Sequence, residues 1–363
     1  DIGNYYALQG VVSIFMPALM GIIADRWVQA QRLLSFCHLM SAIFMGLCAW
    51  IGLSAISSGE MVNGTTLLLA YFGSIAFYMP TLPLSYSVAY TALDKEGLDT
   101  VKAFPPIRIF GTIGFLCAMW LVDLAGWQNT PIQFLESAVF GVLMCLYSLT
   151  MPACPVDKSS SKTSFIDALG LKAFTLFKDK KMATFFIFSF MLGVSLQITN
   201  GYANPYIQSF GNYEEFQGLY FVEHSNLLIS LSQISETLCI LLIPFFLKRY
   251  GIKIVVLIAM LAWVGRFAFF GMGDPGSGVW LFILSCIVYG VAFDFFNVSG
   301  SLYVDKETDV SIRSSAQGLF ILMTNGLGAT AGSLGAKAII NHFVYTDPND
   351  AQFMSLEGWR TSW

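Results

Sequence analysis

The sequence predicts an all-α membrane protein that crosses the bilayer about ten times. Of its 363 residues, 56% are hydrophobic and only 12% are charged, whereas soluble domains contain about 25% charged residues. The mean hydropathy is +0.65. Apolar runs of about 20 residues recur along the chain, and at about 1.5 Å per helical residue each run is long enough to cross a hydrocarbon core of roughly 30 Å.

The apolar runs define the expected spans in chain order. Each span begins and ends where glycine, proline or a group of charged residues interrupts the run. The expected spans are 3–24, 33–55, 65–90, 107–127, 133–152, 183–207, 225–247, 253–272, 278–303 and 313–340.

The loops between these spans alternate in charge. Lysine or arginine occurs in every odd-numbered loop, beginning with Arg26 and Arg32, and is absent from the loops at 57–64, 126–131, 211–218 and 273–278. Cytoplasmic loops are enriched in lysine and arginine. We therefore expect the basic loops to lie inside, and both ends of this piece to lie outside the cytoplasm.

The chain divides into two similar halves. The sequence LDKE at 93–96 follows one expected span and VDKE at 304–307 follows another, on the same expected side of the membrane. We expect a first half at 1–153, a cytoplasmic linker at 154–182 and a second half at 183–363. The linker contains a serine-rich run and then either a helix lying on the membrane surface or a plain connection. Paired halves are typical of transporters, which bind their solute between the halves near the midplane.

Several classes of site are not indicated. The seven cysteines are scattered, mostly inside apolar runs, and the three histidines are far apart, so the sequence predicts no metal site and no disulfide framework. No cofactor is expected. A basic surface for nucleic acid is also absent, and the expected surroundings are the lipid bilayer.

The clearest functional feature is an acid inside an apolar span. Glu236 is the one charged residue in LLISLSQISETLCILLIPFFL at 227–247. A carboxylate at that depth costs a few kcal/mol or more unless it is protonated, paired or exposed to water. Gln233 precedes it by three residues and therefore lies on the same helix face. The pair indicates either a functional polar stripe or a carboxylate that packs against a neighbouring helix.

Three further faces combine amides, aromatic rings and charge at helical spacing. Each also has a plain structural interpretation, namely a charge that reaches the membrane surface, hydrogen bonding between helices, or ordinary packing. The three faces are Arg108 with Thr112 and Phe115, Gln197 with Asn200, and Tyr289 with Phe293 and Phe296 or Asn297. Arg266 and Asp294 are additional charges in adjacent spans, and we expect either a structural ion pair between them or a role in transport.

The segment MGIIADRWVQAQ at 20–31 resembles the G-x-x-x-D-R loop between the second and third helices of the major facilitator superfamily. By this resemblance Asp25 and Arg26 have a structural or gating role at a helix end, although a simple basic turn would have a similar sequence. The family has twelve helices with both ends inside. We accordingly expect this piece to lack the first and last helices.

More specific runs occur at 77–84, 104–115, 196–200, 232–238 and 288–301, among them FPPIRIFGTIGF, LQITN and SQISETL. Together these runs resemble the nucleoside:proton symporter family of that superfamily. The resemblance implies a monomeric, proton-coupled nucleoside importer of the bacterial cytoplasmic membrane. As a hypothesis of mechanism, we expect Glu236 and Asp294 to couple proton movement. The resemblance also implies a nucleoside cavity lined by Arg108, Thr112, Phe115, Gln197, Asn200, Gln233, Glu236, Tyr289 and Phe293.

Three other functions compete with this interpretation. An intramembrane protease would need a second acid, a serine and histidine pair or a metal cluster at membrane depth, and no histidine lies near Glu236 in the sequence. A channel fits the two-half organisation less well than alternating access does. A symporter of a sugar or another polar solute fits the amides and rings as well as a nucleoside symporter does, so the substrate class depends on the resemblance.

Overall fold

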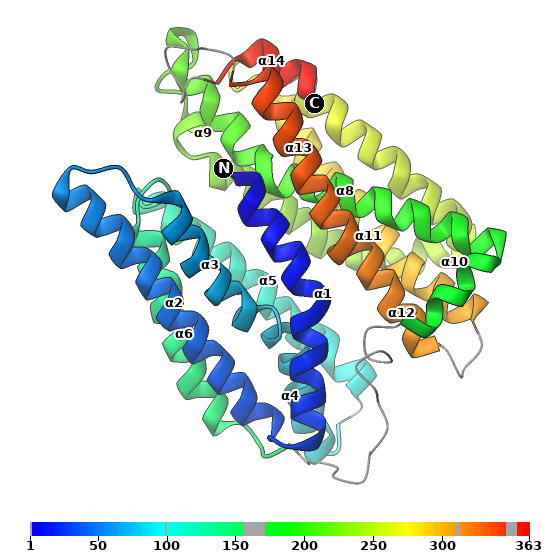
Figure 1. The fold of residues 1–363 in the computed structure, drawn as a ribbon. Coiled ribbons are helices and arrows are strands. Elements are labelled where there is room, and N and C mark those ends of the chain that lie inside the picture. The colour runs from blue at the N-terminus through cyan, green and yellow to red at the C-terminus, as the bar shows by residue number, and fades with distance from the viewer. Residues whose placement is uncertain (1, 99, 155–170, 309–312, 346–353) are drawn as a thin grey trace. The chain divides into compact units, whose positions relative to one another are not determined.

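A computed structural model describes residues 2–98, 100–154, 171–308, 313–345 and 354–363, and it contains helices but no strand within those ranges (Figure 1). The helices of the first part are α1 (Ile2–Arg26), α2 (Ala30–Ser58), α3 (Gly64–Tyr78), α4 (Thr81–Lys95), α5 (Thr100–Leu124) and α6 (Ile132–Thr150). The later helices are η1 (Leu171–Lys178), α8 (Lys180–Ser209), α9 (Tyr220–Glu223), α10 (Ser225–Met272), α11 (Val279–Glu307), α12 (Arg313–Ile321), η4 (Leu322–Gly328), α13 (Ala329–Phe343) and α14 (Leu356–Ser362).

Each of the ten expected spans coincides with a helix or with consecutive helices. In the described part of the chain, seven helices are long and apolar enough to cross a membrane. One of them, α10, has 48 residues and breaks at Gly251, where φ is +74°. That left-handed conformation favours glycine and turns the chain back, so α10 comprises two of the expected spans. Conversely, the single span expected at 65–90 consists of two helices, α3 and α4, which meet at Met79 and Pro80.

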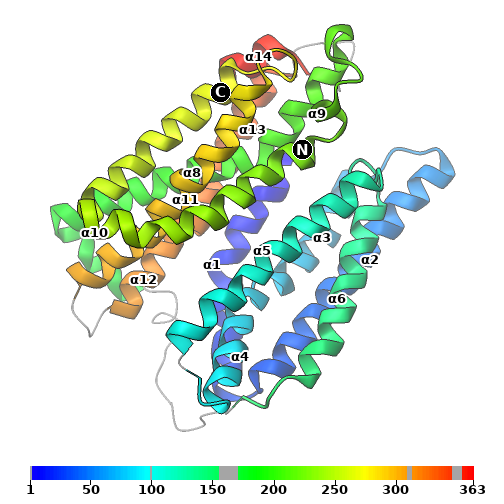
Figure 2. The same cartoon turned by 180° about the vertical axis from the view of Figure 1, so that it is seen from behind.

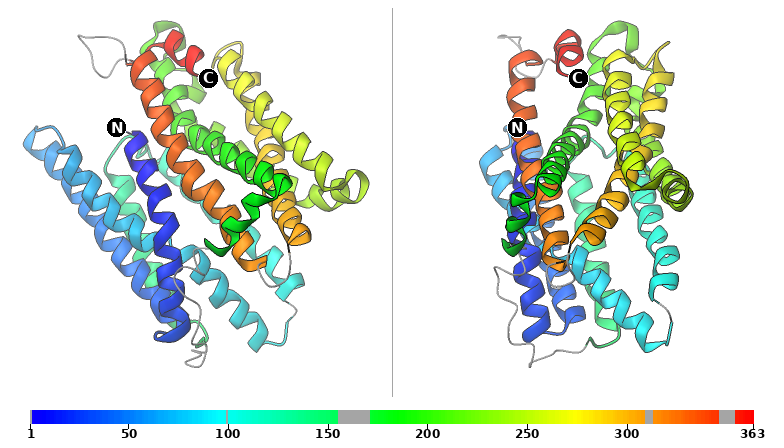
Figure 3. Two further views of the ribbon diagram at one scale, coloured as in Figure 1. Left: turned by 45° about the vertical axis from the view of Figure 1, so that its right-hand side comes forward. Right: turned by 90° about the vertical axis from the view of Figure 1, so that its right-hand side faces the viewer.

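One compact unit contains residues 8–111 and 125–174. Within it α2 packs along α6 and α3, as the left panel of Figure 3 shows. Small polar side chains join these helices: the Ser41 and Ser74 hydroxyls are 2.9 Å apart, and the Ser35 hydroxyl donates to the Cys145 carbonyl at 2.9 Å. Such short side chains let helices approach closely in lipid, where the hydrophobic effect does not drive helices together.

The basic loops of this unit lie together at one end. The Lys95 ammonium donates to the Ala153 carbonyl at 2.7 Å, and the Cys154 amide donates to the Gln31 side-chain oxygen at 2.9 Å. These contacts join the end of α4, the start of α2 and the segment after α6, which is the arrangement that the loop charges predict. The LDKE sequence lies at the end of α4 and VDKE at the end of α11, as expected.

A second compact unit contains residues 1–7, 112–124 and 175–363. In it α8 packs against η4 and α13 through glycines (Figure 1). A Cβ atom on Gly193 would overlap the Thr324 carbonyl, and one on Gly328 would lie 2.6 Å from the Phe190 carbonyl. This close approach coincides with a π-helical turn at Leu322–Gly328. Seen from behind in Figure 2, α10 and α11 form the other side of this unit.

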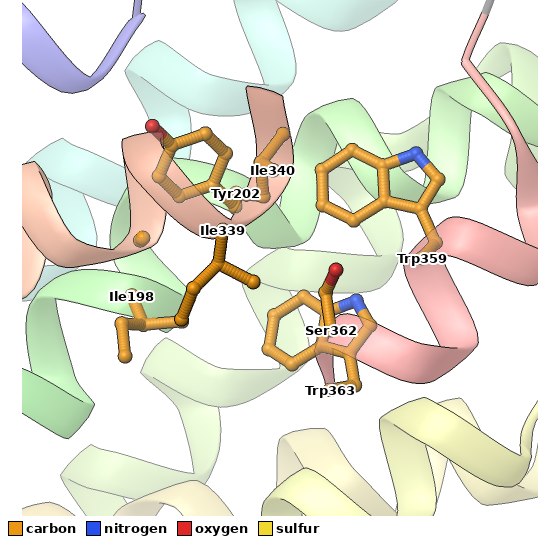
Figure 4. A pocket seen from close by; sticks show the side chains of 8 residues that line it. Ile198, Tyr202, Ile339, Ile340, Trp359, Ser362 and Trp363 are labelled. Carbon is orange, nitrogen blue, oxygen red and sulfur yellow. The ribbon is translucent and has the colours of Figure 1, made fainter. Parts of the chain in front are cut away.

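Aromatic rings fill one end of the second unit. Tyr206 packs against Phe270, Phe282 and Trp359, and its hydroxyl donates to the Phe270 carbonyl at 3.1 Å. Figure 4 shows a narrow apolar pocket beside this cluster, where Trp359 of α14 and Trp363, which follows α14, lie near side chains of α8 and α13. The pocket is lined by Ile198, Tyr202, Ala336, Ile339, Ile340, Trp359, Ser362 and Trp363.

The expected linker is described only in part. Residues 155–170, which include the start of the proposed surface helix, lie outside the described ranges. The following segment Leu171–Lys178 is a 3-10 helix that ends one residue before the Asp179 cap of α8. The division of the chain at 153 and 183 remains a prediction.

Candidate functional site

The close contact between α10 and α11 determines where Glu236 lies. A Cβ atom on Gly290 would lie 2.5 Å from the Ser235 carbonyl, and the Ser235 hydroxyl donates to the Ile287 carbonyl. Glu236, the next residue, is partly buried, and its carboxyl lies within electrostatic range of Tyr289 and Asp294 on α11. The acid predicted from the sequence therefore lies within electrostatic range of polar groups on a neighbouring helix.

Tyr289 packs against two aromatic rings and a guanidinium group. Its ring is parallel to that of Phe293, at 5.6 Å between centroids and 4° between planes, and Trp263 meets it edge-on at 6.1 Å. The Arg266 guanidinium lies 4.4 Å from the centroid of the Tyr289 ring. The predicted i, i+4 face of Tyr289 and Phe293 is thus present, and Tyr289 is only 5% exposed.

Of the two roles expected for Arg266 and Asp294, the ion pair does not form in this structure. Both residues are described, and Arg266 instead donates to the Ser285 carbonyl at 3.0 Å and lies over the rings of Tyr289 and Phe270. The helix explains the difference, because Asp294 follows Tyr289 by five residues and points about 140° away from it around α11. Two charged residues in neighbouring spans of the sequence therefore need not face each other in the structure.

Asp294 lies within electrostatic range of Glu236. Its side chain is 4% exposed, and its Oδ2 atom has no hydrogen-bond partner among the described protein atoms. Two carboxyls within electrostatic range of each other inside a membrane are costly if both are ionised. The arrangement can therefore hold a proton.

Three amide side chains in spans α8 and α10 form no hydrogen bond within the described part of the chain. The amides of Gln197 and Asn200 on α8 and of Gln233 on α10 make no hydrogen bond to another described residue, although the backbone carbonyls of Asn200 and Gln233 accept from Tyr6 and Thr237. Gln197 is 8% exposed. Hydrogen bonding between helices, the alternative interpretation, is not what these amides do in this structure.

The end of α5 is joined to the start of α10. The Trp120 indole donates to the Ser230 hydroxyl at 2.9 Å, and Asp123 lies 2.6 Å from a ring nitrogen of His224. Thr112 lies on the same side of α5 as Asp123, since eleven residues turn an α-helix to within about 20° of the starting direction. Phe115 is 53% exposed.

Three predicted residues can be placed only by their helices. Arg108 lies in α5, and Asp25 and Arg26 form the last turn of α1. Their side chains lie outside the part of the chain that the structure describes. Among the described residues no group of three or more histidine, cysteine or acidic side chains could hold a metal ion.

Sequence reasoning missed three charged or titratable residues. Asp123, 1% exposed, lies near the end of an expected span and pairs with His224. Lys337 lies within the last expected span and donates to the Asn4 side chain at 2.8 Å. Their positions inside apolar segments were the available signal, but their partners are 101 and 333 residues away in the chain.

Comparison with known proteins identifies the family. A family model described as "Nucleoside H+ symporter" matches residues 1–362. The chain belongs to this family. It is 44% identical over 364 residues to the nucleoside permease NupG of Escherichia coli K12, an alignment that covers 100% of this chain and 83% of the permease. The xanthosine permease of the same organism is also 44% identical over the same coverage.

Solved structures agree with this assignment. The crystal structure of the nucleoside transporter NupG matches with a TM-score of 0.87 at 43% identity, covering 100% of this chain and 85% of that one. A D-xylose–proton symporter matches with a TM-score of 0.63 at 14% identity, covering 99% and 84%, and supports the fold alone. This nucleoside H+ symporter has the major facilitator fold, and it is a multi-pass inner-membrane transporter and not an enzyme. A sugar symporter is not favoured.

Proposed function

We propose that this chain imports nucleosides together with protons by alternating access, and that the polar residues of α8, α10 and α11 take part in both tasks. Membership of the nucleoside H+ symporter family supports the transported species. The observation that carries the assignment of residues is the position of Glu236, within electrostatic range of both Tyr289 and Asp294.

The amides of Gln197, Asn200 and Gln233 provide hydrogen bonds for the nucleoside. Each amide has donors and acceptors, as a nucleobase edge and a ribose do. Because these amides have no partner among the described residues, a solute can bind them without breaking protein hydrogen bonds. A polar solute, whose donors and acceptors match those of an amide, is a suitable partner for them.

Aromatic residues supply a surface for the base. Phe115 is 53% exposed and can stack on a base, whereas Tyr289 is 5% exposed and its ring is covered by Phe293 and Arg266. Stacking on an aromatic ring is worth about 1–3 kcal/mol per base in proteins that bind single-stranded nucleic acids. Thr112, one turn before Phe115, adds a hydroxyl to the same region of α5. Arg108, four residues before Thr112 in the sequence, is assigned to the same site by its spacing alone.

Glu236 is the coupling acid of this proposal. It accepts a proton from the outside, and Asp294 beside it disfavours a second negative charge. Once protonated, Glu236 can also donate a hydrogen bond to the nucleoside. Loss of the charge lowers the free energy needed to close the protein around the bound nucleoside. The two halves then reorient. The membrane potential drives the proton with about 2.3 kcal/mol per charge for every 100 mV.

Uptake of radiolabelled uridine and adenosine tests the proposed function. Cells or proteoliposomes that contain the protein should accumulate both nucleosides, and a protonophore should abolish accumulation. Excess glucose should not compete. Accumulation that a protonophore leaves unchanged would contradict proton coupling, and competition by glucose would support a polar-solute transporter of broader specificity.

A further inference from the structure

Two short segments of the expected first half belong to the compact unit of the second half. They are residues 1–7 of α1 and residues 112–124 of α5. Hydrogen bonds join each segment to helices of the second half. The four bonds are Asn4 with Lys337 at 2.8 Å, Tyr6 with the Asn200 carbonyl at 3.1 Å, Trp120 with Ser230 at 2.9 Å and Asp123 with His224 at 2.6 Å.

These bonds lie toward one side of the membrane. The bonds join the first turns of α1 to the later part of α13, and the last turns of α5 to the start of α10. The bond from Tyr6 is the exception, because it reaches Asn200 within α8. The loop that follows α5 and the loop that precedes α9 and α10 contain neither lysine nor arginine. By the positive-inside rule this side faces outward.

The shortest of these bonds joins two groups that can both be charged. The Asp123 side chain is fully buried, and the His224 side chain is 27% exposed. His224 also packs against Tyr220 of α9, at 4.7 Å between ring centroids, and Glu223 precedes it in the chain. The second oxygen of Asp123 has no hydrogen-bond partner among the described residues, so His224 is the main polar contact of this carboxyl.

We propose that Asp123 and His224 are a positioning pair that latches the outer gate of the transporter. The inference rests on the proposed function, because alternating access requires helices of the two halves to separate on the side that opens. A bond from α5 to α10 crosses the expected halves and must break whenever the site opens outward. A bond between helices of one half can persist through the cycle. Asn204 and Asn226, 2.9 Å apart in α8 and α10, provide such a bond near the same side.

Reversible cross-linking distinguishes a gate from a static contact. The double variant Asp123→Cys/His224→Cys is treated with a short bis-methanethiosulfonate linker, and nucleoside uptake is measured before treatment, after it and after reduction. Uptake should fall at least tenfold and recover on reduction. The matched control Asn204→Cys/Asn226→Cys, which links α8 to α10 within one half, should keep its uptake. Undiminished uptake by the cross-linked Asp123→Cys/His224→Cys protein would overturn the proposal that this pair latches the outer gate.

A second measurement does not depend on the transported solute. Asp123→Asn is combined with Phe115→Cys, and labelling by a membrane-impermeant maleimide from outside is compared with Phe115→Cys alone, after subtraction of the signal from the native cysteines. Weakening the latch should raise labelling several-fold. Trp120→Phe, which removes the indole donor to Ser230 and keeps an aromatic ring, should act in the same direction. Unchanged labelling in both variants would overturn the proposal even if nucleoside symport is correct.

Discussion

Glu236 on α10 and Asp294 on α11 lie within electrostatic range of each other, and Asp294 is 4% exposed. Two acids placed in this way inside a membrane share the cost of ionisation, so the proton on one depends on the state of the other. We therefore expect both residues to affect coupling, but through different parts of the cycle.

Replacement of the second acid separates binding from coupling. Asp294→Asn removes one of the two acidic groups and keeps the size of the side chain, so nucleoside binding should persist within about threefold. The dependence of uptake on external pH should change, because Glu236 then loses its acidic neighbour. Uptake measured from pH 5 to 8 checks this, and an unaltered pH profile would show that Asp294 does not influence the coupling acid.

The contact between α10 and α11 depends on a glycine. Gly290→Ala would place a methyl group 2.5 Å from the Ser235 carbonyl, and overpacking of this kind typically costs about 1–3 kcal/mol. We expect a lower melting temperature in detergent and reduced uptake. Gly335→Ala is the matched control, since no atom lies within 4 Å of its Cβ position. Equal stability of the two variants would contradict the close packing.

The Arg266 guanidinium packs on the face of the Tyr289 ring and thereby positions that ring. A buried cation–π contact contributes about 2 kcal/mol, and lysine cannot reproduce the planar guanidinium. Arg266→Lys should therefore weaken nucleoside binding about tenfold. Arg249→Lys is the control, because Arg249 lies 5.6 Å from the Tyr250 ring in a more exposed position and should tolerate the change. Equilibrium binding measured by calorimetry distinguishes the two variants.

The unpaired amides predict a loss of affinity without a loss of stability. Gln197→Ala and Gln233→Ala should each weaken nucleoside binding about fivefold to tenfold, as expected for one hydrogen bond of about 1 kcal/mol. Neither amide bonds a described residue, so the melting temperature should hardly change. Asn204→Ala breaks a bond to Asn226 and should show the reverse pattern. A matching loss of stability in the glutamine variants would indicate a structural role.

The sequence predicted the helices well because spans in lipid follow length and hydropathy, two local properties. Glu236 and the face of Tyr289 and Phe293 were found for the same reason, since spacing along one helix determines which side chains share a face. The linker at 154–182 and the side chains of Asp25, Arg26 and Arg108 are not fully described, and their roles remain predictions.

The contacts between helices were not predictable in the same way. The ion pair of Arg266 with Asp294, one of two expected roles, does not form, because the sequence does not show how α11 is rotated against α10, where Gly290 meets Ser235. The pair of Asp123 with His224 was missed because its members are 101 residues apart. Periodicity determines which face a residue occupies, but helix packing determines what that face meets.

Proton-driven uptake by Glu236→Gln tests the central claim most directly. The variant and the control Glu60→Gln, an exposed acid in a loop, are reconstituted, and uridine accumulation under an inward proton gradient is compared with uridine counterflow without one. We predict that Glu236→Gln loses accumulation but retains counterflow, whereas Glu60→Gln retains both. Full proton-driven accumulation by Glu236→Gln would contradict the assignment of Glu236 as the coupling acid.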